Sequence, residues 1–225
     1  MLLVHVTLFP LRRDTHVGMP GMTGFFGLKD VGQAKAGETI VISAAAGAVG
    51  QTVGQVAKIL GLRVVGIAGG PEKCDWVVNT LGFDACIDYK LSSKAVREGI
   101  KSTCPDGIDI YFDNVGGDIL DTVLTKINMR ARIVICGAIS QYNNTTAVEG
   151  PKNYLSLLVN RARMEGMVVF DYQNQYHEAV SEMSEYLKSG EMISREHVEE
   201  GIENFPEALN ILFSGRNFGK LVLRV

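Results

Sequence analysis

The sequence lacks the cysteine and histidine spacing of a metal site or a disulfide framework. Its four cysteines lie far apart with no C-x-x-C pair, and its four histidines show no ligand or catalytic-triad spacing. These residues are Cys74, Cys86, Cys104, Cys136, His5, His16, His177 and His197. Neither a zinc lobe nor a disulfide-rich fold is indicated. We therefore expect no metal ligands, and reduced thiols in a cytoplasmic protein.

Long apolar runs and an excess of one charge are also missing. No run approaches the roughly 18 apolar residues of a membrane-spanning helix, and the net charge is −3 without a block of like charges. The apolar residues from Leu2 to Phe9 precede Arg12 and Arg13 rather than a small-residue cleavage site, so we expect no signal peptide. Binding to nucleic acid or to a membrane is not expected.

What the sequence does contain is a regular alternation of short apolar runs and amphipathic segments. Its 225 residues are 46% hydrophobic, enough for a substantial core. We expect strands at 40–42, 63–68, 85–88, 108–112, 131–136 and 167–170, helices at 49–60, 71–81, 92–102, 119–127, 154–161 and 175–189, and a connector at 18–24. This alternation predicts an α/β fold, a Rossmann-type doubly wound parallel sheet of about six strands.

The segment from residue 39 to residue 50 organises the rest of the chain. The run Ile40–Ile42 predicts a buried strand, and Ala44, Gly47 and Gly50 then follow as A-x-x-G-x-x-G before a helix. Small residues there let the backbone approach a pyrophosphate at the helix N-terminus. Because Ala44 stands where the usual fingerprint has glycine, the flanking strand and helix carry this inference. A packing turn without a ligand is the alternative.

The ends of the predicted strands supply the candidate binding residues. In an open parallel sheet, ligands lie beyond the carboxyl ends of the strands, near the point where the strand order reverses. We expect one groove lined by residues that follow the first, second, fourth and fifth strands: Ala45, Gly47, Ala48, Val49, Gly69, Gly70, Lys73, Asn114, Val115, Gly116, Gly117, Gly137, Ala138 and Ile139.

The end of the second strand bears on the choice of dinucleotide. An acidic residue at that strand end receives the ribose hydroxyls of NAD, whereas a basic residue nearby receives the extra phosphate of NADP. Here the strand runs into Gly69 and Gly70, Glu72 follows at the start of a helix, and Lys73 comes next. We therefore favour NADP(H) with Lys73 as the phosphate partner; a solvated lysine near a helix end is the alternative.

Few residues are candidates for catalysis. Hydride transfer belongs to the nicotinamide, and the protein orients the substrate and handles a proton. Tyr142 follows the fifth predicted strand and is a candidate to donate a proton or hydrogen bond to an enolate. The alternative is a packing residue with a solvated hydroxyl, which is the commoner role of a loop tyrosine. Asp109 and Asp113 share a strand face, but Asp109 lies at the far end of that strand, so paired-carboxylate chemistry is not supported.

Five motifs in the same order resemble one enzyme family. They are Gly18–Gly24, Ala44–Gly50, Phe112–Gly117, Cys136–Asn143 and Asn217–Lys220. Together they resemble the prostaglandin reductase and curcumin reductase branch of the zinc-free medium-chain dehydrogenase/reductases. The resemblance implies NADPH-dependent reduction of the carbon–carbon double bond of α,β-unsaturated ketones and aldehydes.

The resemblance also implies roles for individual residues. Lys73 and Tyr89 are expected around the ribose phosphate, and Asn114 is expected near the nicotinamide. A cofactor role is further implied for Cys136, Gly137, Ala138, Ile139 and Asn217. Tyr142 becomes the first choice for the proton donor or enolate-orienting group.

The chain departs from the family at its N-terminus. Family members carry a GroES-like β domain before the cofactor domain, whereas residues 1–17 here are unassigned. We expect the Rossmann domain at 18–205, and a helix and strand at 206–225 that return toward the absent domain. The closing strand, 219–225, is expected to need a partner that the chain lacks. A truncated gene product and a fragment of a longer chain both remain open.

Three functions remain open at this stage. The first is an enone or enal reductase acting on a small molecule; the others are a catalytically silent NADP(H)-binding module or assembly subunit, and a quinone reductase. We also expect a homodimer formed through the sheet edge at the predicted strand Met167–Phe170.

Overall fold

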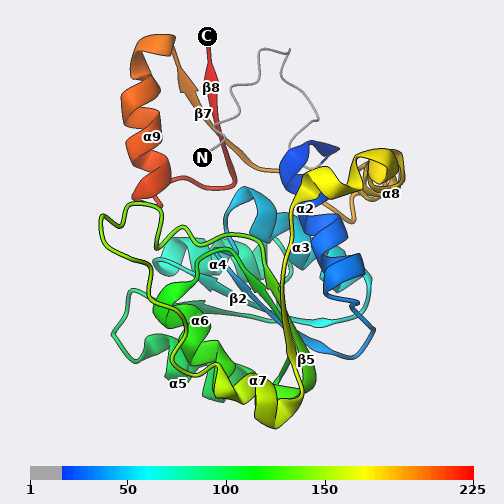
Figure 1. Cartoon of the computed structure of the whole chain (residues 1–225). Coiled ribbons are helices and arrows are strands. Elements are labelled where there is room, and N and C mark those ends of the chain that lie inside the picture. The colour runs from blue at the N-terminus through cyan, green and yellow to red at the C-terminus, as the bar shows by residue number, and fades with distance from the viewer. Residues whose placement is uncertain (1–16) are drawn as a thin grey trace.

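A computed structural model describes residues 17–225, and its centre is a six-stranded parallel sheet (Figure 1). The strand order is β3-β2-β1-β4-β5-β6, so the order reverses between β1 and β4. The strands are β1 Thr39–Ser43, β2 Arg63–Ala68, β3 Ala85–Asp88, β4 Ile108–Asp113, β5 Ile127–Ile135 and β6 Arg163–Gly166. This confirms the predicted Rossmann-type doubly wound sheet.

Helices cover both faces of the sheet because alternate residues of the central strands point to opposite sides. Ile40 and Ile42 of β1 face one buried cluster, and Val41 faces the other. The first cluster includes residues of α2 Met19–Phe26, the π-helix Gly27–Val31, α3 Ala48–Ile59, α4 Pro71–Asn79 and α8 Tyr176–Ser189. The second includes residues of α5 Ala95–Thr103, α6 Gly117–Leu124 and α7 Leu155–Asn160. No helix within residues 17–225 is long and apolar enough to cross a membrane.

The C-terminal part of the chain forms a small unit that stands above the sheet in Figure 1. It consists of β7 Glu196–Glu200, the 3₁₀ turn Ile202–Asn204, α9 Phe205–Phe213 and β8 Lys220–Arg224. The closing strand β8 pairs in parallel with β7, so one of its edges has a partner within the chain. That the closing strand needs a partner that the chain lacks stays a prediction. The domain limits at 17/18 and 205/206 stay predictions.

Three predicted elements were misplaced. The sixth strand lies at Arg163–Gly166 and not at 167–170, because Met167 and Val169 are buried in the core while Val169–Gln175 forms a 3₁₀ helix. β5 begins at Ile127, inside the predicted helix 119–127, because Ile127 pairs with Ile108 before an irregularity in the register.

The predicted connector at 18–24 is also helical. Pro20 stands at the start of α2, where a missing backbone N–H costs nothing. Gly24 is buried where a Cβ would lie 3.1 Å from Val53 Cγ2, so this glycine allows α2 and α3 to pack closely and does not form a turn. The prediction that residues 2–9 are not a signal peptide falls on residues 1–16, which lie outside the described part of the chain.

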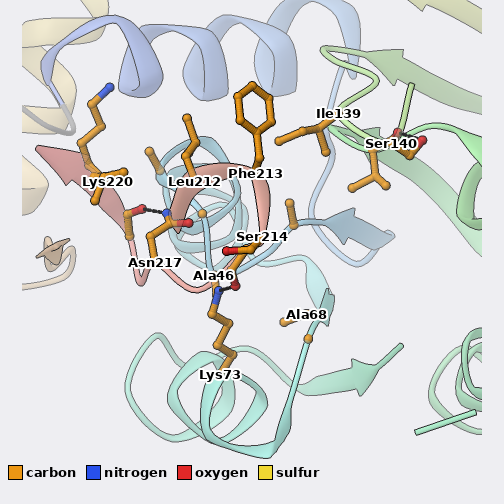
Figure 2. Close-up of a pocket in the computed structure, with 18 of the residues that line it drawn as sticks. Ala46, Ala68, Lys73, Ile139, Ser140, Leu212, Phe213, Ser214, Asn217 and Lys220 are labelled. Atoms are coloured by element: carbon orange, nitrogen blue, oxygen red, sulfur yellow. Dashed lines mark hydrogen bonds between the residues drawn. The ribbon is translucent and has the colours of Figure 1, made fainter. Parts of the chain in front are cut away.

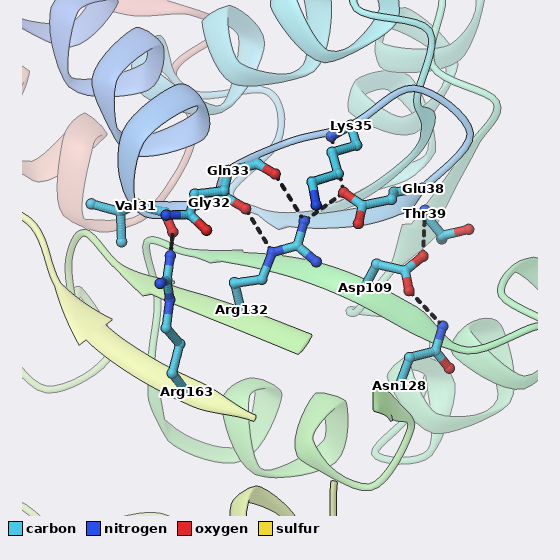
Figure 3. Close-up of polar contacts among 10 residues, drawn as sticks. All are labelled: Val31, Gly32, Gln33, Lys35, Glu38, Thr39, Asp109, Asn128, Arg132 and Arg163. Carbon is cyan, nitrogen blue, oxygen red and sulfur yellow. Dashed lines mark hydrogen bonds and ion pairs between the residues drawn. The ribbon is translucent and has the colours of Figure 1, made fainter. Parts of the chain in front are cut away.

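Polar side chains tie loops to the amino ends of the strands (Figure 3). Arg132 of β5 donates to the carbonyl oxygens of Gly32 at 2.7 Å and Gln33 at 3.2 Å, and to the Glu38 carboxylate at 2.5 Å. Asp109 accepts hydrogen bonds from the Thr39 amide at 2.9 Å and from the Asn128 side chain at 2.8 Å. Asp109 therefore has a structural setting, away from the carboxyl ends of the strands.

Replacing Arg132 tests this network. Arg132→Gln leaves the half-buried Glu38 without its cation and should lower the free energy of unfolding by about 1–3 kcal/mol. Arg130→Gln, on the same strand but exposed, is the matched control and should change it by less than about 0.5 kcal/mol. Urea unfolding measures both. Equal stabilities for the two variants would contradict a structural role for Arg132.

Candidate cofactor site

A cavity of about 710 Å³ opens at the carboxyl ends of the strands, where the strand order reverses. It is lined by the turn after β1, the end of β2, the loops after β4 and β5, α9 and β8. Figure 2 shows these side chains converging from segments far apart in the sequence. This is the position at which open α/β sheets bind ligands.

The turn after β1 is tight, and small residues make it so. Ala44 has a φ of 49°, in the left-handed region where glycine is favoured. A Cβ on Gly50 would lie 2.3 Å from the Ala44 carbonyl oxygen, so this position cannot carry a side chain without moving the turn. α3 begins directly after Gly47, and no side chain among residues 17–225 caps its N-terminus. Because Gly47 and Ala48 line the cavity, the first amide groups of α3 and its positive dipole end lie at the cavity.

One buried carboxylate holds the start of the loop after β4. Asp113 is fully buried, and its Oδ1 accepts hydrogen bonds from the Ser43 hydroxyl, the Tyr111 hydroxyl and the amides of Val115 and Gly116, at 2.9–3.1 Å. Its Oδ2 has no hydrogen-bond partner within the described part of the chain. Burial raises the pKa of Asp113, although these donors act in the opposite direction.

The loops after β4 and β5 are joined to each other. The Asn114 carbonyl accepts from the Ile139 amide at 3.3 Å, and the Asn114 side chain donates to the Ser43 carbonyl at 2.8 Å. The Tyr142 hydroxyl accepts a hydrogen bond from the Ala138 amide at 3.2 Å, and half of this residue is exposed. Burial raises the pKa of the Cys136 thiol to about 12, and the nearby charge of Asp113 adds to this shift. Cys136 is therefore an inert thiol at neutral pH.

Lys73 extends from α4 toward the C-terminal segment (Figure 2). Its amine donates to the Gly215 carbonyl at 2.6 Å and lies 5.3 Å from the centre of the Phe218 ring. Arg195 lies 4.4 Å from that ring and 5.5 Å from the Trp76 ring. Burial lowers the pKa of Lys73, and the neighbouring charge of Lys90 lowers it further.

The C-terminal segment is also attached to the turn after β1 and to α3. The Gly219 amide donates to the Ala46 carbonyl at 2.8 Å. The Gln55 side chain donates to the Ile193 carbonyl at 3.0 Å and accepts from the Ile193 amide at 2.8 Å. The cavity therefore has a lower wall from the Rossmann sheet and an upper wall from the C-terminal unit.

Half of the predicted site residues line this cavity. They are Gly47, Ala48, Gly69, Lys73, Tyr89, Val115, Gly116, Ile139 and Asn217. The others lie in the same turns without lining it: Ala45, Val49, Gly70, Asn114, Gly117, Cys136, Gly137, Ala138 and Tyr142. Ala45 is fully buried and Val49 packs against the core, so their side chains serve the turn and the helix. The binding role of each residue stays a prediction.

Apart from Asn217, the upper wall of the cavity was not predicted from the sequence. It is mostly apolar and is formed by α9 and β8, with Leu209, Leu212, Phe213, Leu221 and Leu223 among its residues. The helix after Pro206 and the closing strand were predicted, but nothing in their sequence indicates that they cover the glycine turn.

A comparison with protein-family models identifies the chain's family. Residues 48–185, well over half of the chain, match the model described as zinc-binding dehydrogenase. The chain belongs to this family of zinc-binding dehydrogenases. Within residues 17–225, no group of three or more His, Cys, Asp and Glu residues could hold a metal ion, so the described residues do not fit a zinc site.

Relatives within the zinc-binding dehydrogenases include the reductases that the motifs resembled. The chain is 45% identical to the NADPH-dependent curcumin reductase of Escherichia coli, covering 93% of this chain and 61% of that one. It is 46% identical to a 2-alkenal reductase (NADP(+)-dependent) of Nicotiana tabacum, covering 99% and 64%. The structure of CurA from Vibrio vulnificus in complex with NADPH superposes with a TM-score of 0.88 at 47% identity, covering 93% and 63%. The chain thus spans somewhat less than two thirds of these relatives.

The buried Asp113 carboxylate predicts that the stability of this chain depends on pH in an unusual direction. Because the folded-state pKa of Asp113 lies above its unfolded value of 3.8, the unfolded chain loses this proton more readily, and stability falls as pH rises through that interval. Asp113→Asn keeps an acceptor at Oδ1 and removes the charge. Its free energy of unfolding, relative to the parent chain, should therefore increase between about pH 4 and pH 7.

A second carboxylate supplies a control of opposite sign. Asp84 is partly buried, but the Val64 amide and the Lys58 amine lower its pKa, so its ionised form stabilises the fold above its unfolded pKa. Asp84→Asn should lose stability relative to the parent as pH rises from the lowered folded pKa of Asp84 to its unfolded value of 3.8, and this difference should stay constant above that value. Urea unfolding at several pH values measures both variants, and slopes of the same sign would contradict this account.

Proposed function

We propose that this chain is the NADP(H)-binding part of an enzyme that reduces the carbon–carbon double bond of α,β-unsaturated ketones and aldehydes. The observation that carries the proposal is the cavity at the point where the strand order reverses. The N-terminus of α3 and the side chain of Lys73 both line this one cavity. Named relatives with NADP-dependent curcumin and alkenal reductase activity support the same cofactor and substrate class. The chain spans only part of those relatives, so turnover is part of the proposal.

The residues that line the cavity fit the pyrophosphate and the ribose phosphate of NADP(H). The pyrophosphate is placed at Gly47 and Ala48, where the backbone is open and the helix dipole is positive. The ribose phosphate is placed beside Lys73 and Tyr89, next to Gly69, where a Cβ would lie 2.9 Å from the Tyr89 hydroxyl. A side chain at position 69 would therefore disturb this end of the cavity.

The nicotinamide end is placed at the loops after β4 and β5. Asn114 and the segment from Cys136 to Ile139 hold these loops together, and Asn217 closes the space from the C-terminal unit. When bound, NADPH supplies the hydride for the β-carbon of an enone. The protein's own task is to orient the substrate and to deliver or orient a proton at the α-carbon.

Tyr142 is proposed for that task. The Ala138 amide donates to its hydroxyl oxygen, which leaves the phenolic proton available for a substrate oxygen, and the residue is half exposed. The hydroxyl would lie 3.1 Å from a Cβ at Gly137, so it sits directly over the turn after β5. This position is suited to a hydrogen bond with a developing enolate.

Reduction of an enone with deuterium-labelled NADPH tests the proposed function. Product deuterated at the β-carbon, together with oxidation of one cofactor per product, is the expected result. Tight NADPH binding without oxidation of any enone would favour a silent binding module or assembly subunit. Turnover of quinones with little turnover of enones would favour a quinone reductase. Either result would reject the proposed reaction.

Tyr142→Phe separates proton handling from cofactor binding. Loss of the hydroxyl should lower the rate of enone reduction about 100-fold, since general acid catalysis contributes factors of that order. The affinity for NADPH should stay unchanged, because Tyr142 does not line the cavity. Tyr154→Phe, on an exposed tyrosine elsewhere, is the matched control. An unaltered rate in Tyr142→Phe would assign the proton to water.

We further propose that two copies of the chain pair through the sheet edge. That edge is β6, and its sequence places Arg163 and Glu165 on either side of Met164. Antiparallel pairing centred on Met164 would set Arg163 against Glu165 of the partner subunit. Beside β6, Leu158 and Val159 of α7 are 74% and 67% exposed, which leaves apolar area for the same interface.

Leu158→Glu should therefore give a monomer by sedimentation at concentrations where the parent chain is a dimer. The control is Leu91→Glu, which alters a leucine of similar exposure (77%) away from α7 and should leave the dimer intact. A parent chain that sediments as a monomer at high concentration would contradict the proposed pairing.

A further inference from the structure

A second lysine, Lys90, lies at the same end of the cavity as Lys73. It follows Tyr89 in the turn after β3, and Asp88 fixes that turn: its Oδ1 accepts from the Lys90 amide at 2.9 Å and from the Gly70 amide at 2.8 Å. The Tyr89 amide donates to the Ala68 carbonyl at 3.1 Å. The backbone of Tyr89 and Lys90 is therefore held against the end of β2.

The side chain of Lys90 lies over Gly69. A Cβ built on Gly69 would be 2.9 Å from Lys90 Cε and 2.9 Å from the Tyr89 hydroxyl, so both side chains occupy the space that a larger residue at 69 would take. The Lys90 amine lies 6.0 Å from the centre of the Tyr89 ring. Gly69 and Tyr89 line the cavity, and Lys90, which does not line it, lies directly beside Gly69.

The two amines of Lys73 and Lys90 are not neutralised by ion pairs. Within residues 17–225, no carboxylate lies within 4.0 Å of either nitrogen. The amines are close enough for the charge of Lys90 to lower the pKa of Lys73, and the charge of Glu72 acts in the opposite direction. Lys73 also donates to the Gly215 carbonyl. Each of these like charges disfavours the other, and a bound anion would offset this repulsion.

We propose that Lys90 is a second cation for the ribose phosphate and that it sets the preference for NADP(H) over NAD(H). A phosphate monoester carries a charge of about −1.5 to −2 at pH 7, which one lysine does not balance and two lysines do. Lys73 approaches from α4 and Lys90 from the turn after β3, and the Tyr89 hydroxyl lies beside Gly69 as Lys90 does. This inference rests on the proposed cofactor and adds a specificity-determining residue to it.

Binding of two adenosine nucleotides isolates this contribution without any enzyme activity. Adenosine 2′,5′-bisphosphate carries the extra phosphate, and adenosine 5′-monophosphate lacks it. Calorimetric titration of the 225-residue chain with each compound is compared for the parent, Lys90→Gln, Lys90→Arg and Lys94→Gln. Lys94 is an exposed lysine a few residues further along and serves as the matched control.

Lys90→Gln should weaken binding of the bisphosphate about tenfold, the value of one hydrogen bond to a charged group. Its affinity for the monophosphate should change by less than about twofold, and Lys94→Gln should change neither. Lys90→Arg should restore most of the bisphosphate affinity, since it keeps the charge. The same loss should appear for NADPH and not for NADH.

The outcomes separate this inference from the proposed function. If the parent binds the bisphosphate more tightly than the monophosphate and Lys90→Gln binds it equally well, the role of Lys90 is refuted and the NADP(H) site stands. An equal loss of affinity for both nucleotides in Lys90→Gln would also refute the role of Lys90, because that pattern indicates a disturbed fold. If the parent shows no preference and does not bind NADPH, both proposals fail.

Discussion

The Ser43 hydroxyl joins the two strands between which the strand order reverses, and the cavity depends on this contact. Ser43 ends β1; its hydroxyl donates to the Asp113 carboxylate at the end of β4 and accepts from the Asn114 amide at 2.8 Å. The segments that follow these two strands lead to α3 and α6 on opposite faces of the sheet, and the cavity lies between them. The Ser43 contacts hold the turn after β1 and the loop after β4 together at the base of this space. The cost is a buried carboxylate whose pKa is raised.

The second constraint is the attachment of the C-terminal unit across this opening. A backbone hydrogen bond from Gly219 to Ala46 and the contact of Lys73 with Gly215 bring α9 and β8 over the glycine turn. The same segment carries Phe218, which lies between Lys73 and Arg195. A phosphate that attracts Lys73 therefore acts on a residue already bound to the upper wall, so cofactor binding and the position of the C-terminal unit are physically connected.

Local patterns predicted the lower wall well, and long-range packing explains what they missed. The small residues of the turn after β1, the helix start at Ala48 and the lysine after β2 are local signals, and the structure brings them together. The edge strand β6 was misplaced because it is short and polar, whereas the apolar run beside it is buried in the core. Apart from Asn217, the upper wall could not be predicted, since it depends on contacts between the C-terminal segment and a turn far away in the sequence. That Ala44 adopts a left-handed conformation also depends on its tertiary setting.

A crystal structure of this chain with NADPH tests the central claim most directly, because the claim concerns position. The account predicts the pyrophosphate at Gly47 and Ala48 on the N-terminus of α3, and the ribose phosphate between the amines of Lys73 and Lys90. The nicotinamide should then lie beside the loops after β4 and β5, within reach of Tyr142. A cofactor bound away from the turn after β1, or with its ribose phosphate turned to solvent, would contradict the account.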